Sequence, residues 1–380
     1  MSSHRSPLDD GDLLAEIFLR LPPQPSSLPR ASAVCKRWRL LVSDPRFLRR
    51  FRLHHRRNPP LLGRFVEKFS TLTFLPTMEA PNRVSPGRLS LQFDHGHFFE
   101  PLGCRHGLAL ISDQTRQQFL VWEPVTGDRH QLAVPPGFDP RTIPMVNGAV
   151  LRVAGDDHFQ VVIVVISNYN TQHGQRVLAC VYSSETGLWG DLISTPIPLE
   201  PNSVVSAIRD PAVLVGDSLY WQLIGFSTSI LEFDFEKQSL AVIQVPVDES
   251  EYENNFKVIR ADGGGLGFMF VSNFTAQLWE RNIDCDGVAS WVLGRTIELD
   301  KLLSLDSEVE DDILILGFAE ENNMVFLWTE SGSFMVQLQS LQFKKLSGFN
   351  TTKHYFTYES VYTAADIGGE HDGAELLHNA

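Results

Sequence analysis

Residues 13–22 read LLAEIFLRLP, and residues 28–51 read LPRASAVCKRWRLLVSDPRFLRRF. The apolar positions of the first segment recur at helical spacing on one face, and they are Leu13, Leu14, Ile17, Phe18 and Leu21. Pro22 and Pro23 end this helix, because proline lacks an N–H donor and has a fixed φ. The segment therefore predicts a short amphipathic helix that stops at a defined point.

A second apolar stripe begins after Ser26 and Ser27, two residues that can cap a helix. Its members are Leu28, Ala31, Val34, Cys35, Trp38, Leu41 and Val42. Ser43-Asp44-Pro45 then stops and restarts the pattern, and Phe47, Leu48 and Phe51 follow. The pattern predicts three short helices within residues 8–55. A domain of about 40 residues usually needs outside help to be stable, so we expect its apolar faces to pack on a partner.

Together these residues resemble the F-box module of the large plant, grass-like class of F-box proteins. The resemblance rests on Leu13-Leu14, Glu16-Ile17, Leu19, Leu21-Pro22, Arg30-Ala31, Val34-Cys35-Lys36, Trp38 and Leu41. Leu-Pro alone would carry no information, whereas LLxEIxLRLP followed by VCKxW at this distance rarely arises by chance. Pro29 departs from the family pattern, which has an aliphatic residue there, and this leaves the start of the second helix open.

The resemblance implies that this face binds the Skp-type adaptor of an SCF (Skp, cullin, F-box) ubiquitin ligase. The residues expected to contact the adaptor, or to support those that do, are Leu13, Leu14, Ile17, Leu21, Pro22, Leu28, Val34, Cys35, Trp38 and Leu41. An apolar stripe at helical spacing is more often plain core, and that alternative stands beside the adaptor hypothesis.

Charge is distributed unevenly along the chain. Residues 1–68 hold 14 Lys and Arg against 6 Asp and Glu, whereas the remaining residues hold 18 against 40. The difference favours two modules with different partners, and the acidic body argues against nucleic acid as the main ligand. The basic run consists of Arg46, Arg49, Arg50, Arg52, Arg56 and Arg57. We favour a solvated helix face for it, and the alternatives are a nuclear import signal or a phosphate-binding patch.

From Phe69 on, the sequence alternates short strands with turn residues. Examples are residues 118–122 and 177–182, and Gly216-Asp217 between two alternating runs predicts a hairpin. Related units recur with a period of about 40 to 50 residues, which is typical of propeller blades. We therefore predict an all-β propeller or propeller-like body of undetermined blade number. It resembles the F-box-associated and kelch-like β domains of such proteins.

The predicted organisation is α+β and multidomain. It comprises a helical F-box module at residues 8–55, a linker at 56–68, a β-propeller-like domain at 69–362 and a disordered tail at 363–380. The tail prediction follows from its acidic, glycine-containing and weakly apolar composition.

The sequence contains no HExxH, CxxC pair, GxSxG or GxxxxGK[ST] motif. The glycine-rich stretch 263–267 fails the dinucleotide fingerprint, because Phe268 stands where the last glycine should be. We interpret it as a strand entry or a loop with close backbone approach. His95 and His97 could share a face and ligate a metal, although loop positions are the more common role for such a pair. We therefore expect no catalytic residue, metal or cofactor, and a substrate site on propeller loops whose residues stay unnamed.

The expected location is the cytoplasm or nucleus. The four cysteines are widely spaced, the sequence shows no secretory signal, and no apolar run approaches the ~18 residues of a membrane helix. The expected function is a non-catalytic substrate-recognition adaptor that binds the Skp-type subunit, through it a cullin, and a substrate protein. Neither nucleic acid nor membrane is an expected partner. The alternatives are a propeller-domain enzyme with an accessory helical module, and a scaffold that binds the adaptor without promoting ubiquitination.

Overall fold

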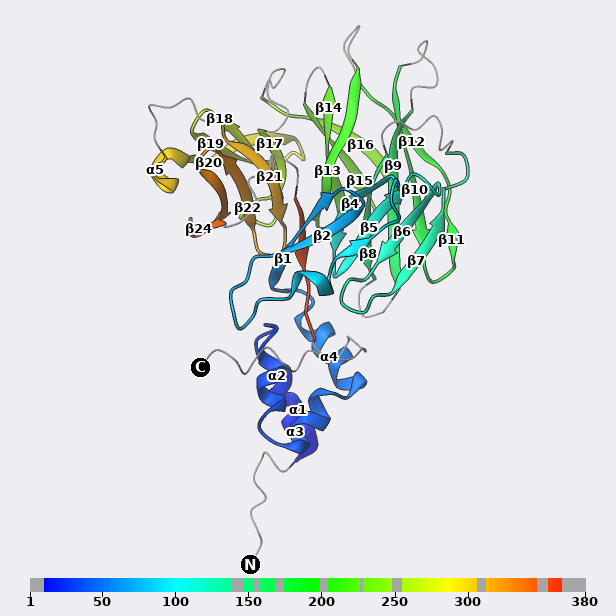
Figure 1. Ribbon diagram of the computed structural model, residues 1–380. Helices are drawn as coiled ribbons and strands as arrows, with labels where there is room; N and C mark the ends of the chain where they lie inside the picture. The colour runs from blue at the N-terminus through cyan, green and yellow to red at the C-terminus, as the bar shows by residue number, and fades with distance from the viewer. Residues whose placement is uncertain are drawn as a thin grey trace, which may run out of the picture.

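The computed structural model describes residues 10–138, 146–153, 158–167, 174–198, 204–225, 228–247, 255–305, 312–346 and 355–363. A small helical module lies beneath a much larger β domain (Figure 1). The predicted disordered tail lies, from residue 364 on, outside the described residues.

The helical module contains four helices, α1 (Gly11–Leu19), α2 (Ser27–Ser32), α3 (Lys36–Val42) and α4 (Pro45–His55). The Asp10 carboxylate caps α1 by accepting from two backbone N–H groups. The predicted count of three helices is wrong, because the second apolar stripe is divided at Cys35, whose backbone is extended with φ −160° and ψ 167°. The division lets Leu28 of α2 and Val42 of α3 reach the same core.

That core closes around α1 and α4. Leu14, Phe18 and Phe51 are each at most 2% exposed, and the Phe18 ring packs edge-on against Trp38 with 4.8 Å between ring centroids. Val361, which follows the last strand of the β domain, belongs to the same cluster. Part of the outside help that so small a module needs therefore comes from its own chain.

The β domain consists of six antiparallel sheets, the blades of a propeller. Blade A contains β1 (Leu61–Lys68), β2 (Thr71–Pro76), β3 (Leu91–Gln92) and β25 (Phe356–Glu359). Blade B contains β4 (Phe99–Arg105), β5 (Leu108–Asp113), β6 (Gln118–Trp122) and β7 (Arg129–Ala133). Blade C contains β8 (Val146–Arg152), β9 (Phe159–Ser167), β10 (Arg176–Ser183), β11 (Leu188–Trp189) and β12 (Ile193–Pro196).

Blade D contains β13 (Val205–Val215), β14 (Ser218–Gly225), β15 (Ser229–Asp234) and β16 (Ser239–Gln244). Blade E contains β17 (Phe256–Arg260), β18 (Leu266–Ser272), β19 (Thr275–Ile283) and β20 (Ala289–Glu298). Blade F contains β21 (Leu314–Ala319), β22 (Met324–Thr329), β23 (Gly332–Gln337) and β24 (Phe343–Leu346). A short helix, α5 (Leu299–Leu303), and a 3-10 turn, η2 (Pro86–Arg88), complete the described elements.

The propeller ring is closed by pairing its two ends. Strands β25, β4, β8, β13, β17 and β21 neighbour one another in that order around the centre. β25 pairs antiparallel with β1, so that Phe356 lies opposite Phe65. Residues 61–68 therefore form the first strand of blade A, and their assignment to a linker is wrong. Leu62 and Phe65 are fully buried there, because the strand lies between two other strands and against blade B.

The main apolar cores lie between neighbouring blades, which confirms the predicted propeller and gives it six blades. Phe65 of blade A packs against Trp122 of blade B with 5.6 Å between ring centroids. The predicted hairpin at Gly216-Asp217 is confirmed, since Val215 pairs with Ser218 across it. The predicted close approach at the glycine-rich stretch is confirmed too, because a Cβ on Gly267 would lie 2.7 Å from a backbone oxygen of β19.

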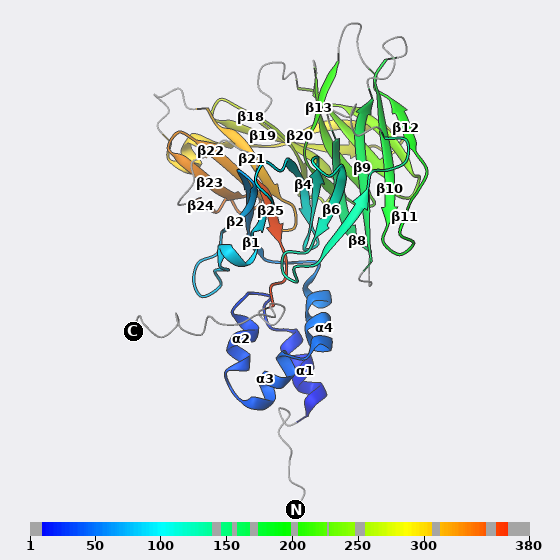
Figure 2. The ribbon, with the colours of Figure 1, turned by 45° about the vertical axis from the view of Figure 1, so that its right-hand side comes forward.

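The two faces of the propeller differ in what covers them. The helical module lies against one of them, which we call the module face (Figure 2). The turn after the innermost strand of blade B, at residues 105–107, opens on this face, and so does the turn after β21 of blade F, where Glu320 accepts from Arg105. On the opposite side, the far face, lie the ends of outermost strands, such as Ala133 at the end of β7 and Gln244 at the end of β16. The two faces are therefore free to serve different partners.

Candidate functional site: the module surface and the cavity at its junction with the propeller

The predicted adaptor residues divide into two groups. Leu13, Val34 and Cys35 are exposed, with exposed fractions of 42% for Leu13 and 62% for Val34, and Pro22 is exposed as well. Ile17, Leu21, Trp38 and Leu41 are half-buried around the module core. These side chains keep apolar surface in contact with solvent.

Leu14 and Leu28 are the buried members of the predicted set, at 0% and 6% exposure. They support the helices from inside and have no surface to offer a partner. Leu40 is not among the predicted adaptor residues, yet at 75% it is the most exposed large aliphatic side chain of the described module. Its position two residues after Trp38 puts it off the core-facing stripe, and that spacing was the available signal.

The basic run of α4 is divided between two surroundings. Arg50 forms an ion pair of 2.6 Å with Glu16 of α1, where both side chains are about half exposed. Arg49, Arg52 and Arg56 instead lie on the side of the helix that borders the propeller. Arg56 donates to the backbone oxygen of Val153, the residue after β8. The predicted solvated face therefore describes only part of the run.

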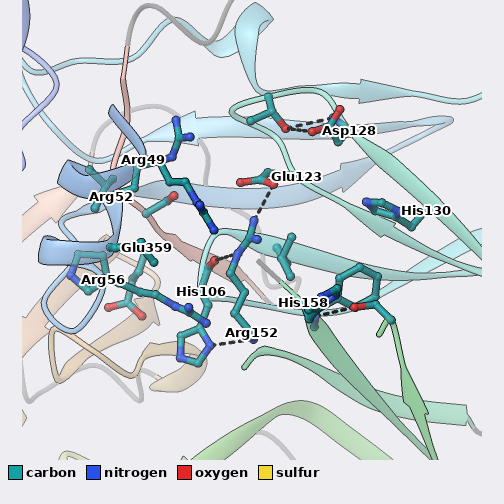
Figure 3. A pocket seen from close by; sticks show the side chains of 18 of the residues that line it. Arg49, Arg52, Arg56, His106, Glu123, Asp128, His130, Arg152, His158 and Glu359 are labelled. Atoms are coloured by element: carbon teal, nitrogen blue, oxygen red, sulfur yellow. Dashed lines mark hydrogen bonds and ion pairs between the residues drawn. The ribbon is translucent and has the colours of Figure 1, made fainter. Parts of the chain in front are cut away.

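A cavity of about 490 Å³ lies between α4 and the module face of blades B and C. Its lining residues are Arg49, Arg52, Leu53, Arg56, Pro59, His106, Leu108, Glu123, Thr126, Asp128, His130, Arg152, His158, Phe159, Tyr182, Ser184, Glu359, Ser360 and Val361. Figure 3 places the α4 arginines on one side, His130 and His158 on the other, and Arg152 with Glu123 between them. The cavity thus has a strongly basic wall and a wall of ring side chains.

The titratable groups of the cavity respond to burial and to this charge. Burial, together with the positive charges of Arg105, Arg56 and Arg152, lowers the pKa of His106 to about 3. Burial raises the pKa of Glu359 to about 7, although bonds donated by Asn322 and a backbone N–H oppose the rise. His106 is therefore neutral at physiological pH, and Glu359 carries only part of its charge there.

The centre of the module face is closed by a network of ion pairs. The Glu320 carboxylate accepts from Arg105 of blade B and lies 2.7 Å from Arg260 of blade E. Lys257 and Asp210 form a second, almost fully buried pair at 2.9 Å. The rim at this point consists of paired charges that join different blades.

The histidine pair considered from the sequence does not act as a pair. His97 lies with its Nε2 atom 2.8 Å from the Asp113 carboxylate and stacks on Phe93, whereas His95 is exposed. Within the described ranges, no three His, Cys, Asp or Glu side chains are placed so that they could hold a metal ion. None of the described helices has the length and apolar character needed to span a membrane.

Comparison with solved structures returns distant likenesses. TolB from Acinetobacter baumannii is 13% identical, with 79% of this chain and 68% of that chain covered and a TM-score of 0.37. The WD40 domain of SCAP from fission yeast is 13% identical, with coverages of 67% and 56% and a TM-score of 0.33. Dipeptidyl peptidase 4 from Porphyromonas gingivalis is 11% identical, with coverages of 65% and 38% and a TM-score of 0.32. The chain thus spans less than two thirds of the last two, and at these TM-scores none of the three bears on function.

No protein of the curated set matches the chain. Two family models match it: an F-box-like model at residues 12–54, and the model of the F-box protein AT5G49610-like β-propeller at residues 102–362. The first covers α1 to α4, and the second covers blades B to F together with β25. The kelch-like character and the grass-like class stay predictions. Because the second match covers well over half of the chain, this protein belongs to the family of F-box proteins with an AT5G49610-like β-propeller.

Proposed function

We propose that this protein is the substrate-recognition subunit of an SCF-type ubiquitin ligase. The observation that carries the proposal is the set of apolar side chains that a small, otherwise well-packed module leaves in solvent, namely Leu13, Val34 and Leu40. Large apolar side chains that so small a module leaves exposed favour a protein–protein contact. In a module that matches the F-box-like family, the partner we propose is the Skp-type adaptor, and through it a cullin.

The substrate protein, in this proposal, binds the far face of the propeller. The module occupies the opposite face, so a substrate on the far face does not compete with the adaptor. Loops on a rigid scaffold are common recognition surfaces. The chain then acts without chemistry of its own, because tethering alone raises the effective concentration of a substrate lysine near the ubiquitin-conjugating enzyme.

The proposed place of action is the cytoplasm or nucleus. All four cysteines, Cys35, Cys104, Cys180 and Cys285, are free thiols, which suits a reducing compartment. The acidic propeller favours a protein substrate over nucleic acid, since phosphate binding needs clustered Lys and Arg.

Co-purification of the full-length chain with a Skp-type adaptor tests the proposal. A Val34→Asp, Leu40→Asp double variant should abolish a micromolar complex, because each aspartate would be buried at an apolar contact at a cost of several kcal/mol. Val288→Asp is the matched control, since Val288 on blade E is 60% exposed and lies outside the module. Leu14 is unsuitable for this test because it is fully buried, and a charge there would unfold the module itself.

Adaptor binding by the wild-type chain and by Val288→Asp, but not by the double variant, is the expected result. Circular dichroism and the unfolding midpoint of each variant show whether the chain has kept its fold. Failure of the folded wild-type chain to bind any Skp-type adaptor would overturn the proposal.

A further inference from the structure

We propose that the cavity between α4 and blades B and C binds a small organic phosphate that carries a planar ring. The α4 arginines would hold the phosphate, and the ring side chains of blades B and C would hold the ring. This inference rests on the cavity alone and does not depend on adaptor binding.

The size and position of the cavity suit a ligand of this kind. Its volume of about 490 Å³ falls within the ~300–1,000 Å³ of typical small-molecule sites. It lies at a junction of two structural units, where such sites often occur. It is lined by α4 and the segment that follows it, by strands and turns of blades B and C, and by residues 359–361 at the end of β25.

The basic wall is built to receive an oxyanion. Arg49 and Arg52 of α4 and Arg56, its C-cap residue, follow one another at helical spacing, and Arg152 enters from β8. A guanidinium presents its N–H donors in a planar fork that matches phosphate. The inference does not require these arginines to lack partners, since each has five N–H donors and keeps its charge whatever it bonds.

The acids of the cavity offset only part of this charge, since three acids, Glu123, Asp128 and Glu359, line it against four arginines. Glu123 pairs with Arg152 at 2.6 Å, and Asp128 accepts from the Thr126 hydroxyl at 2.9 Å. Glu359 accepts from the side-chain amide of Asn322 at 2.7 Å. The pKa of His106 is strongly lowered because the ring is buried and because the surrounding arginines disfavour a further positive charge. An anion is favoured in such a place.

The opposite wall offers ring surfaces. Phe159 lies 5.2 Å from the His130 ring and 6.3 Å from the Tyr182 ring, measured between centroids. Leu108 lines the cavity as well. Aromatic side chains arranged in this way stack with a planar ring. A ligand with a phosphate at one end and a ring at the other would contact both walls, which inorganic phosphate alone would not.

Isothermal titration calorimetry with the full-length protein tests the inference. The probe is adenosine 5′-monophosphate, with inorganic phosphate and adenosine as the two half-ligands. We expect the monophosphate to bind more tightly than either half. An Arg49→Ala, Arg56→Ala double variant should weaken it at least about tenfold, because two charge-assisted contacts are lost. Arg46→Ala, which removes one charge from α4 outside the cavity, should leave the affinity unchanged.

An Arg49→Lys, Arg56→Lys double variant keeps both positive charges but lacks the planar guanidinium groups, so it should weaken binding less than the double alanine variant. It replaces the double alanine variant in the test if that variant fails to fold. Absence of binding by all three probes would overturn the inference. Equal weakening by Arg46→Ala would overturn it as well, since that result would indicate general charge attraction. Monophosphate binding no tighter than that of inorganic phosphate would refute the role of the ring wall.

Discussion

Glu320 joins four blades at the centre of the module face, and its replacement by glutamine tests what holds the ring together. It lies in the turn after β21 and is 9% exposed. One carboxylate oxygen accepts from Arg105 of blade B and, at 3.2 Å, from the backbone N–H of Leu214 in blade D. The other lies 2.7 Å from Arg260 of blade E. Glu320→Gln keeps the volume and removes the charge.

The magnitude follows from the burial of the partners. Removing one member of a buried ion pair costs about 3–5 kcal/mol, because the other charge stays buried and uncompensated. Arg105 is 8% exposed and takes the full effect, whereas Arg260 is 32% exposed and regains contact with water. The glutamine oxygen still accepts one bond. We therefore expect Glu320→Gln to lower the free energy of unfolding by about 2–4 kcal/mol, a large part of a typical total of about 5–15 kcal/mol.

Urea unfolding followed by tryptophan fluorescence measures this change. The unfolding midpoint should fall while the slope with denaturant stays constant, since the amount of surface exposed on unfolding is the same. The matched control is Glu298→Gln, which breaks an ion pair with Lys301 of 2.6 Å on the surface, where the side chains are 58% and 69% exposed. The control should not change the midpoint measurably, because solvent screens such a pair.

The reasoning is refuted if Glu320→Gln unfolds at the same urea concentration as Glu298→Gln and the wild-type chain. In that case the blade interfaces alone would hold the ring, and the central network would contribute nothing to stability. A loss confined to a changed slope would also contradict it, since that would indicate an altered unfolded or native state rather than a lost contact.

Three further changes test other parts of the structure. Gly63→Ala should destabilise strongly, because its Cβ would clash with the Leu75 backbone oxygen, whereas Gly87→Ala, with no atom within 4 Å, should leave the melting temperature unchanged. Deleting residues 355–363 should prevent folding of the propeller, because β25 closes the ring. Loss of cooperative unfolding would show this. Burial raises the pKa of Glu359 from 4.5 to about 7, so between these values the folded chain keeps a proton that the unfolded chain has lost. The free energy of unfolding should therefore fall as pH rises through this range. Urea midpoints measured from pH 4.5 to 8 should show this fall, and Glu359→Gln should reduce it.

The helical module could be predicted from the sequence because its signals are local. The spacing of Leu14 and Phe18 and the stop at Pro22-Pro23 describe α1 without knowledge of any distant residue. The extended backbone at Cys35 could not be predicted in the same way. No proline or glycine stands between Leu28 and Trp38 except Pro29 at the start, so packing on a shared core decides where α2 ends.

Which of the predicted adaptor residues are exposed could not be predicted from local sequence either. Periodicity identifies the apolar residues of a helix but does not distinguish the side that faces the core from the side that faces a partner. Leu13 and Leu14 are adjacent in the sequence, yet one is 42% exposed and the other fully buried. Only the packing of α1 on α4 separates the exposed candidates from their supports.

For the propeller, the strands, the turns and the repeat could be predicted from the sequence, because alternating apolar residues and turn-forming glycines act within a few positions of one another. The number of blades, the closure of the ring and the cavity depend instead on contacts between distant parts of the chain. Phe65 and Phe356 pair although almost the whole β domain separates them along the chain. Arg56 of α4 and Arg152 of β8 meet in one cavity for the same reason. Such contacts depend on where sheets and helices come together in space, and no local pattern records that position.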